Sequence, residues 1–315
     1  ADLKQNLEVV RLVNSGIPHE IRGRVWLVFS GAQEERARFR DSYYNDLLRL
    51  ANEPHYFGSA EREDIRKDVP RTFPRLNQFQ LEENQLVLER VLAAYCLRNP
   101  ESVGYCQSMN MICGALLATM GEEDAFWVLC SMIEHRMGYY ARSMCGLKVD
   151  QLVMSRLLAF VEPELEDHLR ILGITTDDFT VPWFMCLFME SPLRFEEALR
   201  FWDTLFFYGD EMLFEMALAV LDLKRSQILQ LVRQGWCHRC QTQVTDAWEF
   251  LLHDVQKDLR FDELFTTITR PRKLRSLPTN SGTIFQRLFA RLLNERDIQS
   301  LWRAFIAPEP WIILL

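Results

Sequence analysis

The sequence predicts an all-α protein. Apolar residues recur at helical spacing along most of the 315 residues, and alternating strand patterns bounded by turns are almost absent. No internal repeat stands out, and the Gly-rich signatures of phosphate and dinucleotide binding are missing. We therefore expect one continuous helical body, with two lobes sharing a core and no nucleotide pocket of its own.

Composition narrows the class of partner. Apolar residues make up 48% of the chain, enough to fill a sizeable interior, and the net charge is −8 from 36 basic and 44 acidic residues. An acidic chain without a basic stripe is a poor candidate for nucleic-acid binding. A basic patch at residues 270–275 fits a solvated loop or helix end better than a phospholipid site.

Cysteine usage and hydropathy predict a soluble cytoplasmic protein. Most of the eight cysteines lie in apolar helical segments, as expected for buried thiols in a reducing compartment. The CxxC pair of Cys237 and Cys240 lacks a second pair of ligands, so we expect no metal site. The longest apolar runs, such as residues 181–189, are about half the length that a membrane crossing requires. The absence of an initiator Met and the abrupt apolar ending suggest a piece of a longer protein.

Several helices can be placed in order. Residues 83–97 are predicted to form a helix with Val87, Val91, Ala94 and Tyr95 on one face, and Asn99-Pro100 ends it. Ser191-Pro192 begins another helix, which Gly209 closes. Residues 210–232 then read as one long apolar helix. Further helices are predicted at 246–256, 283–294 and 298–305.

The first segment of chemical interest spans residues 15–26. Gly-Ile-Pro at 16–18 ends one helix, and Pro18 can start the next. Arg22 and Trp26 are four residues apart, so they share a helix face and can stack. The sequence favours a purely structural role here, as an anchored helix start.

The second segment is residues 65–71. Ile65 and Asp68 lie on one side of a helix, and Pro70 should force Val69 into an extended conformation. The helix should then stop and leave Arg71 on a loop, where its guanidinium can reach phosphate groups of a partner. From spacing alone, a surface arginine in a salt bridge is the better interpretation.

The third segment is residues 104–110. Gln107 precedes an apolar helix and should project opposite the face that contains Met109. Gly114 and Ala118 are small and in line with Gln107, so another surface can approach closely there. Taken alone, this residue is a solvated glutamine at a helix start.

Together these segments resemble the TBC domain family, with a match over roughly residues 14–260. Five features occur in the family's order: Arg22 with Trp26, IxxDxxR at 65–71, YxQ at 105–107, WFxxLF at 183–188 and the helical stretch at 201–221.

The resemblance implies one roughly V-shaped domain over residues 1–315, with two helical subdomains and with 261–315 as its C-terminal helices. It implies a GTP-bound Rab-family GTPase in the groove. Arg71 would be the arginine finger and Gln107 the glutamine finger. GTP and Mg²⁺ would belong to the partner, with no cofactor of the domain's own. Peripheral recruitment to the cytosolic face of endomembranes would come through the partner or other domains.

The resemblance also assigns residues that support the fingers. Asp68 and Tyr105 are the main supporting residues. We expect Asp68 to pair with a basic side chain, with Arg22 as the candidate. The remaining supports are Ile65, Arg22, Trp26 and Asn110.

Two positions depart from the family pattern. Ser108 follows Gln107 where the family usually has glycine, which adds a Cβ where a partner can approach. Pro70 precedes Arg71 where the family commonly has another residue, and we expect its fixed φ to pre-set the loop.

Three alternatives stay open. A catalytically silent TBC domain would bind a Rab protein as an adaptor. A helical scaffold would have no GTPase partner, and it should show internal self-similarity. A hydrolase would use His135, His168 or His253, yet none lies near a Ser or Cys elbow.

Overall fold

The computed structural model describes residues 6–53, 55, 58–190, 193–231, 250–251 and 259–269, and in these residues the regular elements are all helices. The all-α prediction is therefore confirmed for this part of the chain. Contacts divide the chain into two compact units, Ala1–Ser143 with Phe195–Gly209, and Met144–Arg194 with Asp210–Leu315.

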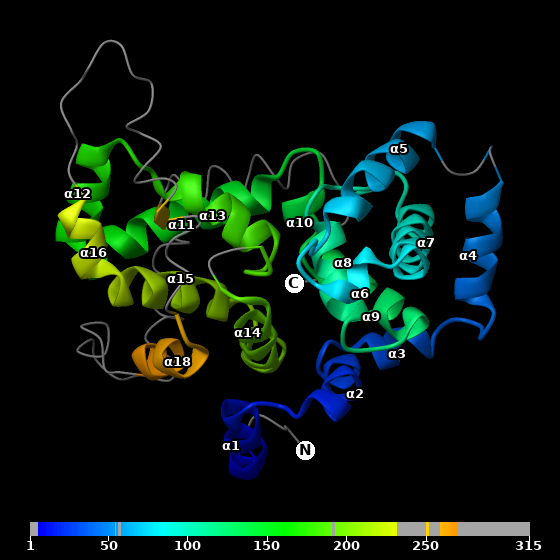
Figure 1. The fold of residues 1–315 in the computed structure, drawn as a ribbon, viewed down its shortest axis with the longest axis horizontal. Helices are drawn as coiled ribbons and strands as arrows, with labels where there is room; N and C mark the ends of the chain where they lie inside the picture. The colour runs from blue at the N-terminus through cyan, green and yellow to red at the C-terminus, as the bar shows by residue number, and fades with distance from the viewer. Residues whose placement is uncertain are drawn as a thin grey trace. The chain divides into compact units, whose positions relative to one another are not determined.

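The first unit contains most of the N-terminal helices (Figure 1). Its elements are α1 Leu7–Ser15, α2 His19–Phe29, α3 Ala32–Arg36, α4 Tyr43–Asn52, α5 Ser59–Asp68, the 3₁₀ turn η2 Val69–Arg71, α6 Asn77–Gln80, α7 Glu82–Arg98, α8 Met109–Leu117, α9 Glu122–His135, α10 Met137–Tyr140 and α14 Phe195–Tyr208.

Helix α7 forms the centre of this unit. It packs against α4, α5, α6, α8 and α9 (Figure 1). Of the predicted face, Val91, Ala94 and Tyr95 are buried and Val87 is half-buried. Leu88 and Leu92 are buried as well. Neighbours therefore cover α7 on several sides, which makes its buried surface wider than the single face that its periodicity predicted.

The second unit is also helical. Its described elements are α11 Cys145–Val161, α12 Pro163–Leu172, α13 Thr176–Met185, α15 Glu211–Leu223, α16 Arg225–Gln230 and α18 Phe261–Thr269. Thr175 caps α13 in a reciprocal capping box with Asp178, which satisfies backbone N–H groups at the start of the helix.

The prediction of one long helix over 210–232 is wrong. Helix α15 ends at Leu223, and α16 begins at Arg225 after a break at Lys224. Helix α16 packs against α12, where Arg225 pairs with Glu162 and Glu164. Gly209, with φ of +101°, does close α14 as expected.

Several sequence features fall outside the described residues. These are the Ser191-Pro192 helix start, the CxxC pair, His253, the basic patch at 270–275, the predicted helices at 283–294 and 298–305, and nearly all of the one at 246–256. Within the described residues, no helix is long and apolar enough to cross a membrane, and no cluster of three potential metal ligands occurs. The described part of the chain holds six cysteines, all free thiols, and four of them are buried.

Candidate functional site

Arg71 ends a short helical turn that projects its side chain to the surface. Helix α5 stops at Asp68, as the sequence predicts, and η2 follows directly. The backbone N–H of Thr72 donates to the Val69 carbonyl at 3.2 Å and closes the turn. The Arg71 side chain is 55% exposed, whereas Ile65 on the same helix is fully buried and anchors it.

The predicted extended conformation of Val69 is wrong. Val69 has φ of −53° and ψ of −50°, within the right-handed helical region. A proline disfavours this region for the residue before it without forbidding it. The missing N–H of Pro70 lies at the start of the 3₁₀ turn, where an amide donor is dispensable. Arg71 therefore ends a structured turn rather than lying on a loop.

Asp68 joins the arginine segment to the glutamine segment. Its carboxylate forms an ion pair with the Arg71 guanidinium at 2.5 Å and accepts a hydrogen bond from the Tyr105 hydroxyl at 2.6 Å. Asp68 itself is buried, whereas the Arg71 side chain stays 55% exposed. One carboxylate thereby contacts both the guanidinium of Arg71 and the side chain of Tyr105, two residues before Gln107.

The predicted pair between Asp68 and Arg22 is wrong. Arg22 instead donates from Nε and Nη2 to the buried carboxylate of Asp203, at 3.0 and 3.2 Å. Trp26 Nε1 donates to the same carboxylate at 2.9 Å, and the Arg22 Cζ lies 6.0 Å from the centre of the Trp26 ring. This cluster is the anchored helix start that the sequence favoured for residues 15–26.

Gln107 lies in a turn before α8. Its side chain is exposed, and among the described residues its amide has no hydrogen-bond partner. Gly104, with φ of +61°, begins the turn, and its N–H donates to the Asn99 carbonyl at 2.8 Å. The free amide can therefore reach toward a partner.

Ser108 occupies a backbone conformation that favours glycine. It is the N-cap residue of α8, with φ of +95° and ψ of −29°. An L-residue is strained there because its Cβ approaches the backbone. The glycine that the family usually has here would therefore fit this backbone conformation better than Ser108 does.

A second polar connection runs through Thr72 and Asn110. The Thr72 hydroxyl donates to the Asp68 carbonyl at 2.9 Å and accepts from Asn110 Nδ2 at 2.8 Å. Asn110 Oδ1 in turn accepts the backbone N–H of Ser108 at 3.2 Å. Thr72 and Asn110 are both buried, so this connection lies beneath the two exposed side chains.

The close approach predicted at Gly114 is made by the chain itself. A Cβ at Gly114 would lie 2.8 Å from Thr72 Cγ2 and 3.1 Å from a ring carbon of Phe73. The small residue therefore lets the segment that follows Arg71 pack against α8. It does not leave room for a foreign surface at that position, which corrects the sequence-based interpretation.

Burial keeps the groups around Asp68 protonated. It raises the pKa of the Tyr105 hydroxyl well above its ordinary value, and the hydrogen bond to Asp68 acts in the same direction. Burial, with a contribution from Asp68, also raises the pKa of the Cys106 thiol to about 11. At neutral pH Tyr105 is thus a proton donor to Asp68, and Cys106 is a neutral thiol.

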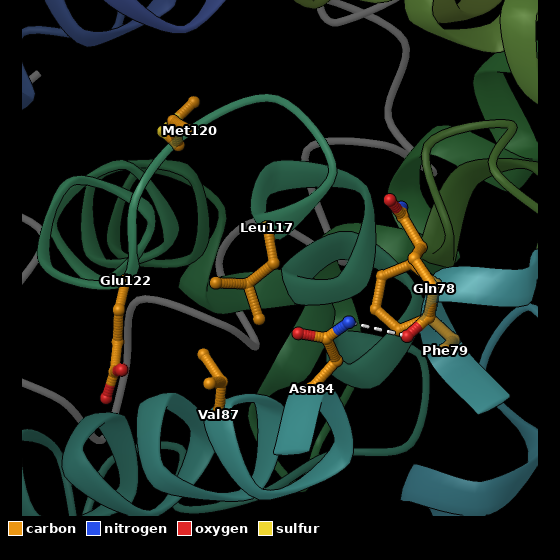
Figure 2. A pocket seen from close by; sticks show the side chains of 7 residues that line it. All are labelled: Gln78, Phe79, Asn84, Val87, Leu117, Met120 and Glu122. Atoms are coloured by element: carbon orange, nitrogen blue, oxygen red, sulfur yellow. Dashed lines mark hydrogen bonds between the residues drawn. The ribbon is translucent and has the colours of Figure 1, made fainter. Parts of the chain in front are cut away.

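A small pocket of about 230 Å³ lies between α6, α7 and the end of α8, and neither Arg71 nor Gln107 lines it. Figure 2 shows Asn84, Val87 and Leu117 directed toward one another, with Asn84 Nδ2 donating to the Gln78 carbonyl at 2.7 Å. Its acidic residue, Glu122, already accepts hydrogen bonds from Arg90 and Tyr44. The pocket thus offers no unengaged acid or base, so we place the candidate site at Arg71 and Gln107.

Comparison with known proteins identifies the family. A profile of the Rab-GTPase-TBC domain matches residues 19–229. The chain belongs to this family. Growth hormone-regulated TBC protein 1-A of Danio rerio is 37% identical over 231 residues, covering 72% of this chain and 63% of that protein. Its Homo sapiens counterpart is 37% identical over 227 residues, covering 70% of this chain and 65% of that protein. The TBC region therefore spans less than two-thirds of these relatives.

Solved TBC domains share the fold. The Chlamydomonas flagellar RabGAP TBC domain superposes with a TM-score of 0.69 at 27% identity, over 85% of each chain. The Ypt/Rab-GAP domain of Gyp1p superposes with a TM-score of 0.67 over 92% of each chain, and at 18% identity this shows the fold alone. The all-helical TBC architecture is thus established, and the inclusion of residues 270–315 in it stays a prediction.

The sequence analysis missed two buried polar residues that hold segments of the first unit together, Asp203 and Thr72. Asp203 is an acid within the apolar, aromatic stretch 201–207, and such a residue must find partners inside the fold. That signal was available. Thr72 gave no comparable signal, because its role depends on a hydrogen bond to a residue 38 positions away.

Proposed function

We propose that this TBC domain accelerates GTP hydrolysis by a Rab-family GTPase in its GTP form. The observation that carries the proposal is that Arg71 and Gln107 are both exposed while the buried carboxylate of Asp68 ties their segments together. Two polar side chains held in this way can enter a partner's nucleotide site from one surface.

Arg71 acts as the arginine finger in this proposal. Phosphoryl transfer builds negative charge on the oxygens of the transferred group, and a guanidinium supplied in trans stabilises that charge. Such a residue contributes on the order of 10³ to 10⁵ in rate. The pair with Asp68 orients the guanidinium, which is exposed enough to be offered to a partner.

Gln107 acts as the glutamine finger and aims the attacking water. Its amide can accept from and donate to a water molecule without changing protonation state. Placement and electrostatics do the work for both residues, so neither needs a perturbed pKa. The supporting role of Tyr105 follows from its bond to Asp68.

The partner supplies GTP and Mg²⁺, and the domain brings no cofactor of its own. We expect the protein to act in the cytoplasm, in vesicle trafficking, and to reach the cytosolic face of endomembranes through the GTPase or other domains. The curated relatives extend well beyond the matched region, which leaves room for such domains in them.

The test is single-turnover phosphate release from a panel of purified, GTP-loaded Rab proteins. We expect the wild-type domain to accelerate hydrolysis by at least one of them, and Arg71→Ala and Gln107→Ala each to remove most of the acceleration. Circular dichroism would show that both variants stay folded. A panel that binds the wild-type domain without faster phosphate release would instead support the silent adaptor.

A further inference from the structure

We infer that Thr72 is a positioning residue that couples the placement of Gln107 to that of Arg71. The inference rests on the proposed function and adds to it a residue that the family resemblance did not assign. Its basis is the hydroxyl group of Thr72, which joins the two segments beneath the surface.

The Thr72 hydroxyl makes two specific hydrogen bonds, one as donor and one as acceptor. It donates its proton to the Asp68 carbonyl at 2.9 Å and accepts from Asn110 Nδ2 at 2.8 Å. Thr72 has no exposed surface, so water cannot replace either partner. A side chain without the hydroxyl would leave the Asn110 amide buried and unsatisfied.

Asn110 carries the connection to the glutamine turn. Its Oδ1 accepts the N–H of Ser108, the residue next to Gln107. Because Ser108 is held in a strained backbone conformation, the hydrogen bond to its N–H helps to define the turn. Loss of the Thr72 bond would free the Asn110 amide to rotate and would release Ser108.

The methyl group of Thr72 adds a steric constraint. It lies so close to α8 that a Cβ at Gly114 would sit 2.8 Å from Thr72 Cγ2. Two hydrogen bonds and one packing contact therefore fix Thr72 against α8. The first residue after Arg71 thus sets the distance between the arginine turn and the helix that follows Gln107.

The first experiment compares two substitutions of Thr72. Thr72→Val keeps the shape and removes the hydroxyl, whereas Thr72→Ser keeps the hydroxyl. We use the Rab protein that the wild-type domain stimulates most and measure single-turnover hydrolysis over a range of domain concentrations. Thr72→Val should lower the saturating rate by about 10- to 100-fold, the range expected for a small misplacement. The half-saturating concentration should stay near wild type, and Thr72→Ser should recover most of the rate.

A second experiment tests position without removing the hydroxyl. Gly114→Ala should lower the saturating rate, because the added methyl displaces Thr72. Thr72→Ser lacks Cγ2, so the double variant Gly114→Ala/Thr72→Ser should be faster than Gly114→Ala alone. If circular dichroism shows that Thr72→Val does not fold, the comparison of Gly114→Ala with the double variant tests the role of Thr72 instead. A double variant no faster than Gly114→Ala would overturn the inference in that case.

A third comparison links Thr72 to Gln107. If Thr72 acts by placing Gln107, Thr72→Val should cost much less in a Gln107→Ala background than in the wild type. Equal fold-losses in both backgrounds would overturn the coupling.

Failure of the inference is distinct from failure of the proposed function. A wild-type saturating rate for folded Thr72→Val, together with loss of rate in Arg71→Ala, would reject the role of Thr72 alone. A wild-type domain that accelerates no Rab protein in the panel would reject the function, and the inference would fall with it.

Discussion

The carboxylate of Asp203 binds the guanidinium of Arg22, although the two residues are 181 positions apart in the chain. The same carboxylate accepts Trp26 Nε1 and the backbone N–H of Ile17, at 2.9 and 3.0 Å. Burial raises the pKa of Asp203, and the bonds from Arg22, Ile17 and Trp26 act in the opposite direction. This cluster fastens α14 to the start of α2 and defines one side of the first unit.

Trp26→Ala should destabilise the domain by roughly 3–5 kcal/mol. Trp26 is fully buried, and its ring centre lies 5.4 Å from that of Trp202 and 5.1 Å from that of Phe206. The substitution leaves a cavity and removes a hydrogen bond to Asp203. Urea unfolding followed by circular dichroism measures the loss. Val28→Ala, at a position 43% exposed on the same helix, serves as control and should change little.

Arg71→Lys should remove most of the stimulation while leaving the domain folded. Lysine keeps the charge but offers no planar fork of donors, so it cannot bridge two phosphate oxygens as arginine does. We expect a loss on the order of 10³ in the single-turnover rate. Arg49→Lys is a matched control, because Arg49 lies exposed on α4 and pairs with Asp46 of its own helix. A wild-type rate for Arg71→Lys would contradict the assignment.

Asp68→Asn should slow the stimulated reaction without abolishing it. Arg71 contacts one carboxylate oxygen of Asp68 and Tyr105 the other, and an amide replaces one of these oxygens by an NH2 group that cannot accept. We expect a drop of about tenfold or more in the saturating rate, because Arg71 loses its orienting charge. The reaction is measured with the domain in excess. An unchanged rate would show that Asp68 does not position the finger.

Ser108→Gly should stabilise the domain by up to about 1 kcal/mol. Glycine relieves the strain at φ of +95°, and this gain exceeds the extra freedom that it gives the unfolded chain. Ser108→Ala keeps the Cβ and the strain, so it should bring no such gain. Thermal unfolding of the three proteins gives the comparison. Equal stability of the glycine and alanine variants would argue against strain at this position.

Glu122→Gln should destabilise the domain in a manner that depends on pH. Burial alone would raise the pKa of Glu122, but hydrogen bonds from Arg90 and Tyr44 outweigh it, so the pKa is lowered overall. A lowered folded-state pKa contributes stability above the unfolded value of about 4.3, and this stability is lost as pH falls through the folded value. The gap between wild type and Glu122→Gln should therefore be full at pH 7 and close below pH ~4.

Urea titrations at several pH values would measure this gap. Glu83→Gln is the control, since Glu83 is exposed on α7. A gap that stays constant from pH 7 to pH ~3 would show that the charge of Glu122 is not the source.

Local sequence signals predicted a helix well where a residue at its boundary is enough to end it. Gly209 closes α14, and α7 spans nearly the range that its periodicity gave. The break at Lys224 was missed because it accompanies a contact between residues far apart in the sequence. Directly after the break, Arg225 pairs with Glu162 and Glu164. Periodicity within one helix holds no information on such a pairing.

The candidate site was predictable in its residues and less so in its connections. The resemblance placed Asp68 and Tyr105 beside the fingers, and the structure brings them into contact. The Asp68–Arg22 pair was wrong because charge alone does not choose between partners, and Asp203 lies closer to Arg22 in space. Val69 stayed helical because its tertiary packing outweighs the preference imposed by Pro70.

The chain reaches α14 only after it has passed through residues 144–194, which belong to the other unit. A nascent chain that has emerged only as far as Ser143 therefore holds Arg22 and Trp26 without the carboxylate and the rings that complete their surroundings. The N-terminal part can therefore complete its packing only after Phe195–Gly209 has been synthesised. For the same reason, a contiguous fragment ending at Ser143 is a poor choice for expressing the finger-bearing unit by itself.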